Sequence, residues 1–268
     1  MDSEDGKKAG VGLAARLALL FGGRKPGDLP RPFVRKHGRY TSLKFSRSQT
    51  QSRMLSADPD ALLIDYTRTM MAALLLQPEP ACIGMVGLGG GSQAKFCHRH
   101  LPQSRIEVVE NNPAVIALRR KFSIPDDDPR LQVHLGDGAE FLRTRRGRYD
   151  VLLVDGYDEQ GIPQALSTLA FYEDCRAALA PGGVMSVNLF STDAQRHAEL
   201  LEECFGDRVV MLEEPRMSNR VAFAWLDDLL PGQLEAGAAL RGLPDAARRQ
   251  LGPAFARLEQ ALERHLDQ

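Results

Sequence analysis

Two carboxylates and a tyrosine follow an apolar run near the middle of the chain, in the order Asp155-Gly-Tyr157-Asp158. The run itself, residues 149–155, is apolar enough to form a strand that is buried on both faces of a sheet. Ligands of open α/β sheets bind outside the carboxyl ends of the strands, so these side chains are well placed for chemistry. A carboxylate there is suited to accept a proton from an attacking group, and a simple turn is the alternative.

A glycine-rich segment, Gly87-Leu-Gly89-Gly-Gly91, precedes Ser92 and lies between a predicted strand and a predicted helix. Glycines at such a junction let the backbone approach a ligand, and the helix that follows offers free N–H groups. The spacing is G-x-G-x-x-S, so a serine occupies the third position of the dinucleotide fingerprint. By itself the pattern also fits a tight turn without a ligand.

Two more carboxylates end the next two predicted strands. Glu110 lies nineteen residues after the last loop glycine, where an acid can accept hydrogen bonds from both ribose hydroxyls. Asp137, which precedes Gly138, could accept a hydrogen bond from the amino group of an adenine or cap the following helix. The alternative for Glu110 is a plain surface carboxylate. An adenosine ligand without pyrophosphate fits this set better than a dinucleotide, which points to S-adenosylmethionine or its decarboxylated form.

A regular alternation of strand and helix patterns from residue 82 onward would position these side chains. The spacing predicts an α/β fold with a doubly wound, mainly parallel sheet. The expected strands are 82–86, 105–110, 131–135, 149–155, 184–189, 208–212 and 220–225. The expected helices are 60–76, 93–101, 113–122, 139–144, 166–180, 194–205 and 232–267, the last interrupted at Gly242-Leu-Pro244.

Four regions are expected along the chain. Residues 1–38 read as a basic N-terminal arm, and residues 39–78 as a small β-hairpin module with a helix. Residues 79–230 form the α/β catalytic domain, and residues 231–268 form C-terminal helices. Residues 1–56 hold twelve Lys or Arg against four Asp or Glu, which predicts a solvated arm or, alternatively, one that faces an anion or a partner.

Composition excludes several classes of function. The chain has 268 residues and a net charge of −1, so it has no overall attraction for nucleic acid or anionic lipid. Aromatic residues make up 6%, too few for a platform that stacks single-stranded nucleic acid. The apolar run 11–21 is shorter than a membrane span and contains Arg16. We therefore expect a cytoplasmic protein with no membrane or nucleic-acid partner.

The cysteines and histidines indicate neither disulfides nor a metal site. Cys82, Cys97, Cys175 and Cys204 are far apart and lie in apolar or helical surroundings, which favours buried, reduced thiols. The His98-Arg-His100 pair lacks a clustered third ligand, so no metal is expected.

From about Gln51 to Phe190 the chain resembles the spermidine synthase (polyamine aminopropyltransferase) family. Spacing and order together make this resemblance more specific than the glycine loop alone. It implies a Rossmann-like, methyltransferase-type doubly wound sheet behind a small N-terminal β-domain. The matching motifs are residues 83–91, 108–110, 133–138 and 149–158, followed by Phe171-Tyr172 and Pro181-Gly-Gly-Val184.

The resemblance also implies roles for individual residues. Asp155 would deprotonate the attacking amine, and Tyr157 and Asp158 would line the amine site. Glu110 would hold the ribose and Asp137 the adenine amino group. The remaining donor-site residues would be Gln51, Gly87, Gly89, Gly91, Ser92 and Gly138, and Tyr66 would lie near the amine.

The implied reaction is transfer of an aminopropyl group from decarboxylated S-adenosylmethionine to a polyamine, with release of methylthioadenosine. The resemblance implies no metal and allows a homodimer. Three departures weaken the match in the amine half of the site: Ser92 replaces an aspartate, Thr69 stands where a glutamate is common, and residues 159–163 differ. The alternatives are a methyltransferase or aminocarboxypropyl transferase that uses intact S-adenosylmethionine, or a non-catalytic nucleoside-binding relative.

Overall fold

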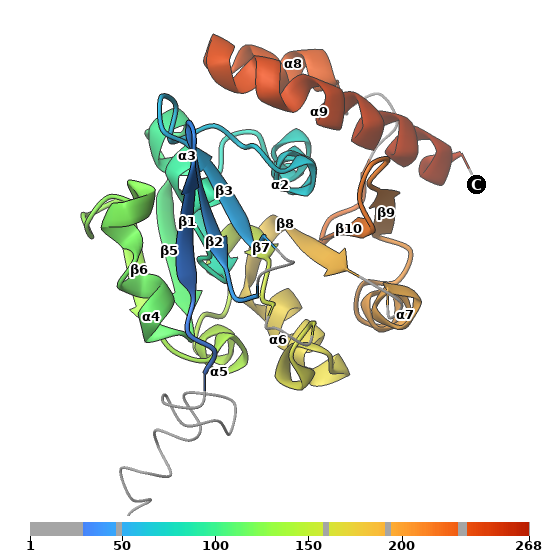
Figure 1. Ribbon diagram of the computed structural model, residues 1–268. Coiled ribbons are helices and arrows are strands. Elements are labelled where there is room, and N and C mark those ends of the chain that lie inside the picture. Colours follow the sequence, from blue (N-terminus) through green and yellow to red (C-terminus); the bar gives the residue numbers. More distant parts are fainter. Residues whose placement is uncertain (1–28, 47–49, 158–160, 191–193, 230–234, 268) are drawn as a thin grey trace, which may run out of the picture.

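The computed structural model of the chain describes residues 29–46, 50–157, 161–190, 194–229 and 235–267. They form a three-stranded antiparallel sheet and a seven-stranded, mostly parallel sheet with helices on both faces (Figure 1). The doubly wound α/β architecture predicted from the sequence is therefore confirmed, with the small N-terminal sheet lying in front of the large one.

The large sheet has the order β6-β5-β4-β7-β8-β10-β9. Strands β4 to β8 pair in parallel, whereas β10 runs antiparallel to both β8 and β9. After β4 the chain adds β5 and β6 on one side and then returns to add β7 on the other, so the strand order reverses between β4 and β7. Such a switch point is where open α/β sheets bind ligands. The strands are β4 (Cys82–Val86), β5 (Arg105–Glu110), β6 (Leu131–Leu135), β7 (Tyr149–Val154), β8 (Leu179–Phe190), β9 (Val209–Glu213) and β10 (Asn219–Trp225).

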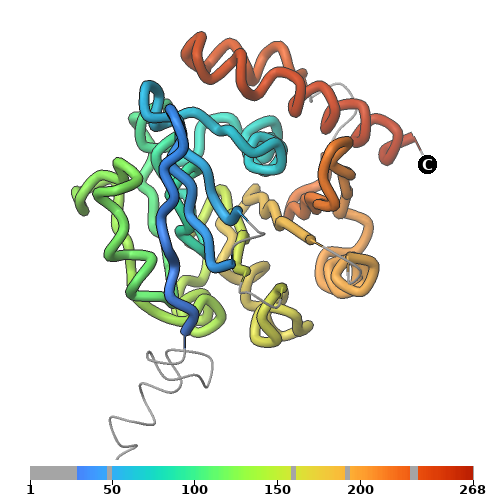
Figure 2. Tube along the Cα trace, in the orientation of Figure 1, coloured from blue at the N-terminus to red at the C-terminus, as the bar shows by residue number. Residues whose placement is uncertain are grey.

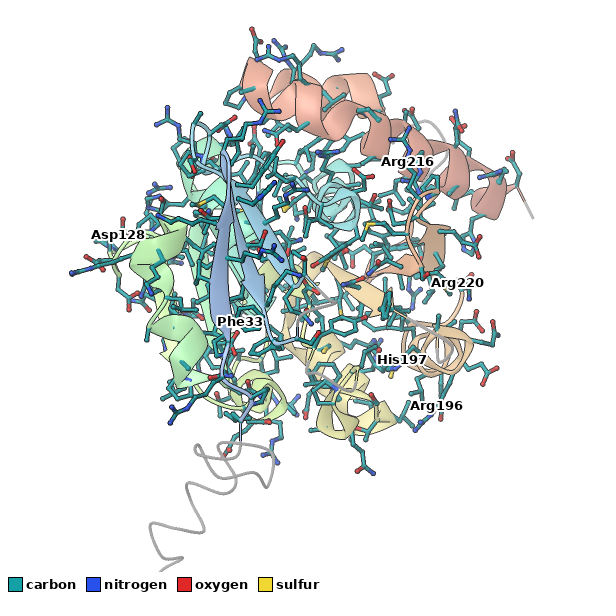
Figure 3. All side chains as sticks on the ribbon, in the orientation of Figure 1. Phe33, Asp128, Arg196, His197, Arg216 and Arg220 are labelled. Atoms are coloured by element: carbon teal, nitrogen blue, oxygen red, sulfur yellow. The ribbon has the colours of Figure 1, made fainter. Side chains whose placement is uncertain are left out.

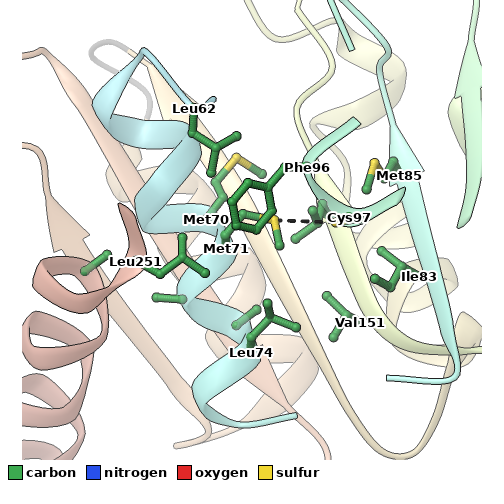
Figure 4. Packing of buried hydrophobic residues seen from close by; sticks show 14 of the residues in the cluster. Leu62, Met70, Met71, Leu74, Ile83, Met85, Phe96, Cys97, Val151 and Leu251 are labelled. Atoms are coloured by element: carbon green, nitrogen blue, oxygen red, sulfur yellow. Dashed lines mark hydrogen bonds between the residues drawn. The ribbon is translucent and has the colours of Figure 1, made fainter. Parts of the chain in front are cut away.

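Alternating side chains of these strands supply two apolar cores. Ile83 and Met85 of β4 belong to one core, while Cys82 and Val86 belong to the other. The first core is covered by α2 (Asp65–Met70), the 3₁₀ helix η2 (Met71–Leu75), α3 (Ser92–His100), α4 (Pro113–Ile116) and α9 (Asp245–Leu266), as Figure 4 shows in part. The second is covered by α5 (Gly138–Arg143), α6 (Leu169–Ala178) and α7 (Ala194–Phe205).

The small sheet has one strand more than predicted. Strands β2 (Tyr40–Lys44) and β3 (Ser52–Leu55) form the expected hairpin, and β1 (Phe33–His37) adds to β2 inside the range predicted as a basic arm. The side chains of β1 are mostly exposed, including Phe33 at its start (Figure 3). The strand is held by backbone pairing rather than by a buried apolar face, so its sequence carries no alternating pattern.

Three predicted helices are shorter or broken in the structure. The helix expected over 60–76 begins only at Asp65, and the one expected over 113–122 is α4 followed by the 3₁₀ helix η3 (Arg119–Phe122). The helix expected over 166–180 is the short 3₁₀ helix η4 (Gln164–Leu166) followed by α6, whose N-terminus is capped by the hydroxyl of Thr168. Strand β8 begins at Leu179 and therefore includes the Pro-Gly-Gly segment that was predicted to end the helix. The pairing of β8 with β7 is irregular at this segment.

The C-terminal helices were predicted with their break. They are α8 (Ala236–Arg241) and α9, and α9 packs beside α2, far away in the sequence (Figure 2). The Arg257 guanidinium on α9 donates to the Thr69 hydroxyl on α2 at 3.3 Å. None of the helices in the described segments is long and apolar enough to cross a membrane.

The four cysteines are free thiols, as expected. Cys82, Cys97 and Cys175 are buried, whereas Cys204 is only half-buried. Burial raises the pKa of Cys204 to about 11, so this thiol is protonated at neutral pH.

Candidate active site

The predicted glycines and the acids Glu110, Asp137 and Asp155 lie at the carboxyl ends of β4, β5, β6 and β7. The glycine loop leaves β4 and passes directly over the end of β7. Gly87 has a positive φ of 95°, and a Cβ there would lie 2.3 Å from the backbone oxygen of Asp155. Only glycine allows this approach, because any side chain would push the loop away from the strand. The loop and the candidate base are therefore held against each other by backbone contact.

The end of the loop packs as closely as its beginning. Gly91 precedes α3 in the left-handed conformation, and a Cβ on it would lie 2.5 Å from the Ile124 side chain. A Cβ on Gly90 would lie 2.4 Å from the Ser52 hydroxyl oxygen of β3. The loop is thus confined between the small sheet and the segment after η3, with its backbone N–H groups at the start of α3.

Glu110 is buried rather than a surface carboxylate. Its Oε2 accepts a hydrogen bond from the Leu88 N–H at 2.9 Å, and its Oε1 accepts one from the Asn112 N–H at 2.9 Å. Burial raises the pKa of this carboxyl, while the backbone N–H groups oppose that rise. The side chain of Asn112 caps α4 by accepting a hydrogen bond from the Ala114 N–H at 3.0 Å. Each Glu110 oxygen keeps acceptor capacity for a ribose hydroxyl.

Asp137 lies beyond the end of β6 and caps α5. It accepts a hydrogen bond from the Glu140 N–H at 3.0 Å and remains half-buried. Gly138 follows, and a Cβ on it would lie 2.6 Å from the Val86 side chain. This contact holds the start of α5 against β4, which places Asp137 on the same edge as the glycine loop. Capping uses one carboxylate oxygen, so the role in binding an adenine stays compatible with it.

Asp155 is held on both oxygens by neutral donors. The Tyr66 hydroxyl donates to Oδ2 at 3.0 Å, and the Asn188 amide donates to Oδ1 at 2.8 Å. Burial raises the pKa of Asp155, although both hydrogen bonds favour the ionised form. Burial and the Asp155 charge together raise the pKa of Tyr66, so the tyrosine stays protonated and donates. The structure thus brings Tyr66, on α2, to the candidate base at the end of β7.

Two asparagines belong to the same network and were not found from the sequence. Asn188 lies on β8 and Asn219 on β10, and both side chains are buried. The Asn219 amide donates to the Asn188 side-chain oxygen at 2.8 Å, and Asn188 in turn donates to Asp155. This chain of amides fixes the Asn188 rotamer and hence the orientation of the carboxylate. For Asn188 the available signal was a single amide inside an apolar strand, which must find a partner when buried. Asn219 is the first residue of β10 and just precedes the predicted strand, so it gave no such signal.

Tyr157 is fixed by the backbone rather than by the candidate base. Its hydroxyl donates to the Asn188 carbonyl at 2.7 Å and accepts from the Phe190 N–H at 2.5 Å. Burial, and then the Asp155 charge, raise its pKa, so the phenol is neutral. Since its one hydroxyl hydrogen is already used, Tyr157 can line the site but is poorly suited to move a proton. Asp158 lies outside the described residues.

The small sheet reaches the glycine loop through β3. The Ser52 hydroxyl lies 3.4 Å from the Ser92 hydroxyl at the start of α3. Gln51 precedes Ser52, and its backbone N–H donates to the Leu43 carbonyl at 2.9 Å. The backbone of Gln51 is therefore held by the hairpin, next to Ser52 and the glycine loop. Gln93, which follows Ser92, is buried and donates to the Met70 sulfur at 3.5 Å.

Comparisons with known proteins give one consistent result. A family model described as the spermine/spermidine synthase domain matches residues 63–203. A polyamine aminopropyltransferase from Chromobacterium violaceum is 35% identical over 230 residues, which cover 85% of this chain and 87% of that protein.

Solved structures show the same fold. A probable spermidine synthase from Corynebacterium glutamicum superposes with a TM-score of 0.66 at 21% identity, covering 83% of this chain and 91% of that one. Human methyltransferase-like protein 13, solved in complex with SAH, superposes with a TM-score of 0.58 at 25% identity, covering 72% of this chain and 93% of that one. The methyltransferase-type sheet predicted from the sequence is therefore confirmed.

Proposed function

The chain belongs to the spermine/spermidine synthase family, and we propose that it transfers the aminopropyl group of decarboxylated S-adenosylmethionine to a polyamine acceptor. The observation that carries this proposal is the arrangement around Asp155. Its carboxylate accepts hydrogen bonds from the neutral side chains of Tyr66 and Asn188. The glycine loop lies against the Asp155 backbone and also donates to Glu110, the acid expected to bind a ribose. Among the described residues no Lys, Arg or His forms an ion pair with Asp155, and such a negative charge suits both a cationic amine and a sulfonium donor.

The reaction needs a base because the acceptor is an alkylammonium at neutral pH. Asp155 accepts a proton from this ammonium group, and the freed amine attacks the aminopropyl carbon next to the sulfonium. A new C–N bond forms as the C–S bond breaks, and the bonding electrons return to sulfur, which leaves neutral methylthioadenosine. The raised pKa of Asp155 brings the carboxyl closer to neutral pH and makes it a stronger base. Because the sulfonium is a good leaving group, most of the remaining work is alignment.

The nucleoside half of the donor would lie across the carboxyl ends of β4, β5 and β6. Glu110 would accept hydrogen bonds from the ribose hydroxyls, and Asp137 would accept one from the adenine amino group. The buried position of Glu110 supports this role, because its two backbone hydrogen bonds fix both oxygens. The glycine loop would run beneath the sugar and the sulfonium, and Gln51 would reach the donor from the small sheet.

A second candidate function uses intact S-adenosylmethionine as the donor. The hydroxyls of Ser52 and Ser92 form a neutral pair at the start of α3, beside the loop. A neutral pair at a helix N-terminus does not repel the carboxylate that the intact donor carries. Aminocarboxypropyl transfer through the same base is therefore the alternative, and a methyltransferase would use the same nucleoside edge.

Mass spectrometry of the products separates these functions. The protein is mixed with either donor and a panel of amines. Aminopropyl transfer predicts methylthioadenosine and an acceptor heavier by one aminopropyl group, with the decarboxylated donor only. An acceptor carrying an aminocarboxypropyl group, or S-adenosylhomocysteine with a methylated product, would replace the proposal with the second function. Turnover by neither donor, with methylthioadenosine still bound, would leave a nucleoside-binding protein.

A further inference from the structure

An open cavity of about 620 Å³ lies toward the amino ends of β4 and β5. The candidate active site lies at the other, carboxyl ends of these strands. Cys82 and Arg105, the first residues of β4 and β5, are part of its lining, and so are residues 144–148 between α5 and β7. Arg105 of the lining and Glu110 lie at the two ends of β5, roughly 17 Å apart at about 3.3 Å per residue, whereas Glu107 of the lining is about 10 Å from Glu110. The proposed reaction leaves this cavity unused.

Four arginines surround the cavity, at positions 105, 145, 146 and 148. The lining contains one acid, Glu107, and a second acid, Asp150, lies nearby and accepts from the Cys82 N–H at 2.8 Å. Counting both acids, the region carries a formal charge of +2. Since the whole chain has a net charge of −1, this is a local concentration of positive charge rather than a general property.

Glu107 fixes two of the four arginines. It is buried and accepts two hydrogen bonds from Arg148 and one from the Tyr149 hydroxyl at 2.8 Å. Arg145 lies 3.5 Å from the same carboxylate. Burial would raise the pKa of Glu107, but the hydrogen bonds from Arg148 and Tyr149 outweigh it and hold the pKa below its usual value. The arrangement therefore differs from a solvated run of charges, because a buried anion sets where two guanidinium groups lie.

Three polar groups of the cavity have no protein partner. The exposed side chains of Arg105 and Arg146 make no hydrogen bond or ion pair within the segments that the structure describes. The Nε2 atom of His134 is buried and likewise has no hydrogen-bond partner there. The His134 ring is held by the Phe141 ring, with centroids 5.2 Å apart. A buried nitrogen without a partner is costly, and His134 is part of the cavity lining.

We propose that this cavity binds a ligand with linked phosphate groups, such as inorganic tripolyphosphate or the phosphate chain of a nucleoside triphosphate. Guanidinium groups recognise phosphate oxygens with paired, directional hydrogen bonds. Arginines on β5 and in the 144–148 loop face one cavity from two sides, which suits several phosphates better than one. The volume lies within the range of small-molecule sites. The site takes anions, so it repels the cationic donor and acceptor of the proposed reaction, and it does not depend on that reaction.

Calorimetric titration of the full-length protein with sodium tripolyphosphate and with ATP, at low ionic strength and without magnesium, tests the proposal. We expect one molecule bound per chain for both probes. The double variant Arg105→Gln/Arg146→Gln should weaken binding about 10-fold or more, because it removes two of the guanidinium groups. It should fold normally, since neither side chain has a partner within the described chain. The matched control is Arg241→Gln, an exposed arginine on α8, which should bind like the wild type.

A second variant tests the unpartnered histidine. His134→Phe keeps a ring against Phe141 but removes the nitrogen, and it should weaken tripolyphosphate binding with little change in melting temperature. Tripolyphosphate and ATP that compete with each other, and that leave methylthioadenosine binding unchanged, would support the site at this edge.

Several outcomes would overturn the proposal. They are equal affinity of the double variant and the wild type, equal loss in the Arg241→Gln control, and displacement of methylthioadenosine by tripolyphosphate. Binding of ATP without tripolyphosphate would assign the affinity to the nucleoside instead. A single-stranded RNA that binds more tightly than tripolyphosphate through the same arginines would make the edge a nucleic-acid surface.

Discussion

The two ends of β5 carry the same side chain in opposite electrostatic settings. Glu110 is held by backbone N–H groups at the carboxyl end, while Glu107 is held by arginines toward the amino end. Burial acts to raise the pKa of both carboxyls. The result differs, because the charged donors around Glu107 outweigh burial and the neutral donors around Glu110 do not.

This difference separates carboxylates whose negative charge is not paired with a cation from a carboxylate whose charge is neutralised by arginines. At the carboxyl edge, Glu110 and Asp155 are stabilised by N–H and O–H dipoles, so their charge remains available to a cationic ligand. At the amino edge, Glu107 neutralises part of an arginine cluster and leaves an excess of positive charge. Burial therefore does not decide what a carboxylate does. The charge of its hydrogen-bond donors decides it.

The largest expected effect is a loss of turnover when Asp155, at the carboxyl end of β7, is changed. Asp155→Asn removes the proton acceptor and keeps the shape, so turnover should fall by about 100-fold or more, the scale of general-base loss. Methylthioadenosine binding should persist in calorimetry. The control is Asp150→Asn at the other end of β7, which should keep wild-type turnover. An Asp155→Asn enzyme with unchanged kcat would refute the assignment of the base.

Glu110→Gln and Glu107→Gln compare the two ends of β5 directly. Glu110→Gln should weaken methylthioadenosine binding about 10-fold or more, because a charge-assisted hydrogen bond is worth roughly 1.5–3 kcal/mol. Glu107→Gln should leave that affinity unchanged. Calorimetry with the same nucleoside measures both variants. Equal losses in the two variants would mean that β5 acts only as a scaffold and that Glu110 has no direct contact with the ribose.

Tyr66→Phe tests whether neutral donors orient the base. Losing the hydroxyl removes one of the two hydrogen bonds to Asp155, so kcat should fall by about 5-fold to 10-fold, equivalent to roughly 1–1.4 kcal/mol. Nucleoside affinity should not change, which separates positioning from donor binding. Steady-state kinetics with calorimetry on the same preparation gives both values. A nucleoside affinity that falls in step with kcat would indicate a general loss of packing at α2.

Glu107 and Asp155 should contribute to the pH dependence of stability with opposite signs. The pKa of Glu107 is lowered on folding, so its stabilising contribution is present at neutral pH and is lost as the pH falls through its folded pKa. The pKa of Asp155 is raised on folding, so ionising it opposes folding at neutral pH, and this opposition disappears at low pH. Melting temperatures from pH 7 down to about pH 3 should therefore show Glu107→Gln less stable and Asp155→Asn more stable than the wild type, with both differences shrinking.

Wild-type stability for Glu107→Gln at every pH would contradict the account of the amino edge. An Asp155→Asn variant that melts below the wild type at pH 7 would show that Asp155 contributes more to packing than its burial costs.

Much of the nucleoside edge could be predicted from the sequence because it depends on local signals. A short apolar run defines β4, and short segments that mix apolar with polar residues define β5 and β6. The residue that ends or follows each strand lies at the carboxyl end of the parallel sheet. The glycines that follow β4 and the acid that ends β5 were enough to place Gly87 and Glu110. The break of the C-terminal helices at Gly242-Leu-Pro244 is local in the same sense.

Other parts of the fold gave no such signal. Strand β1 is held by backbone pairing to β2 and exposes most of its side chains, so nothing in its pattern distinguishes it from an arm. The helix predicted to run from residue 60 starts at Asp65, because the β3–α2 connection is fixed by distant contacts such as the Leu62 N–H to the Gln250 side chain.

The sequence by itself determined where the strands lie along the chain and which acids end them, since hydrophobic periodicity and glycine turns act between near neighbours. The tertiary structure alone decided that Tyr66, Asp155 and Asn188 share hydrogen bonds. These residues lie in three separate parts of the chain that come together only in the folded protein. It also decided that two arginines of the 144–148 segment pair with Glu107, which lies on β5 far away in the sequence. Packing sets the charge and polarity of a carboxylate's neighbours, and those neighbours set its chemistry.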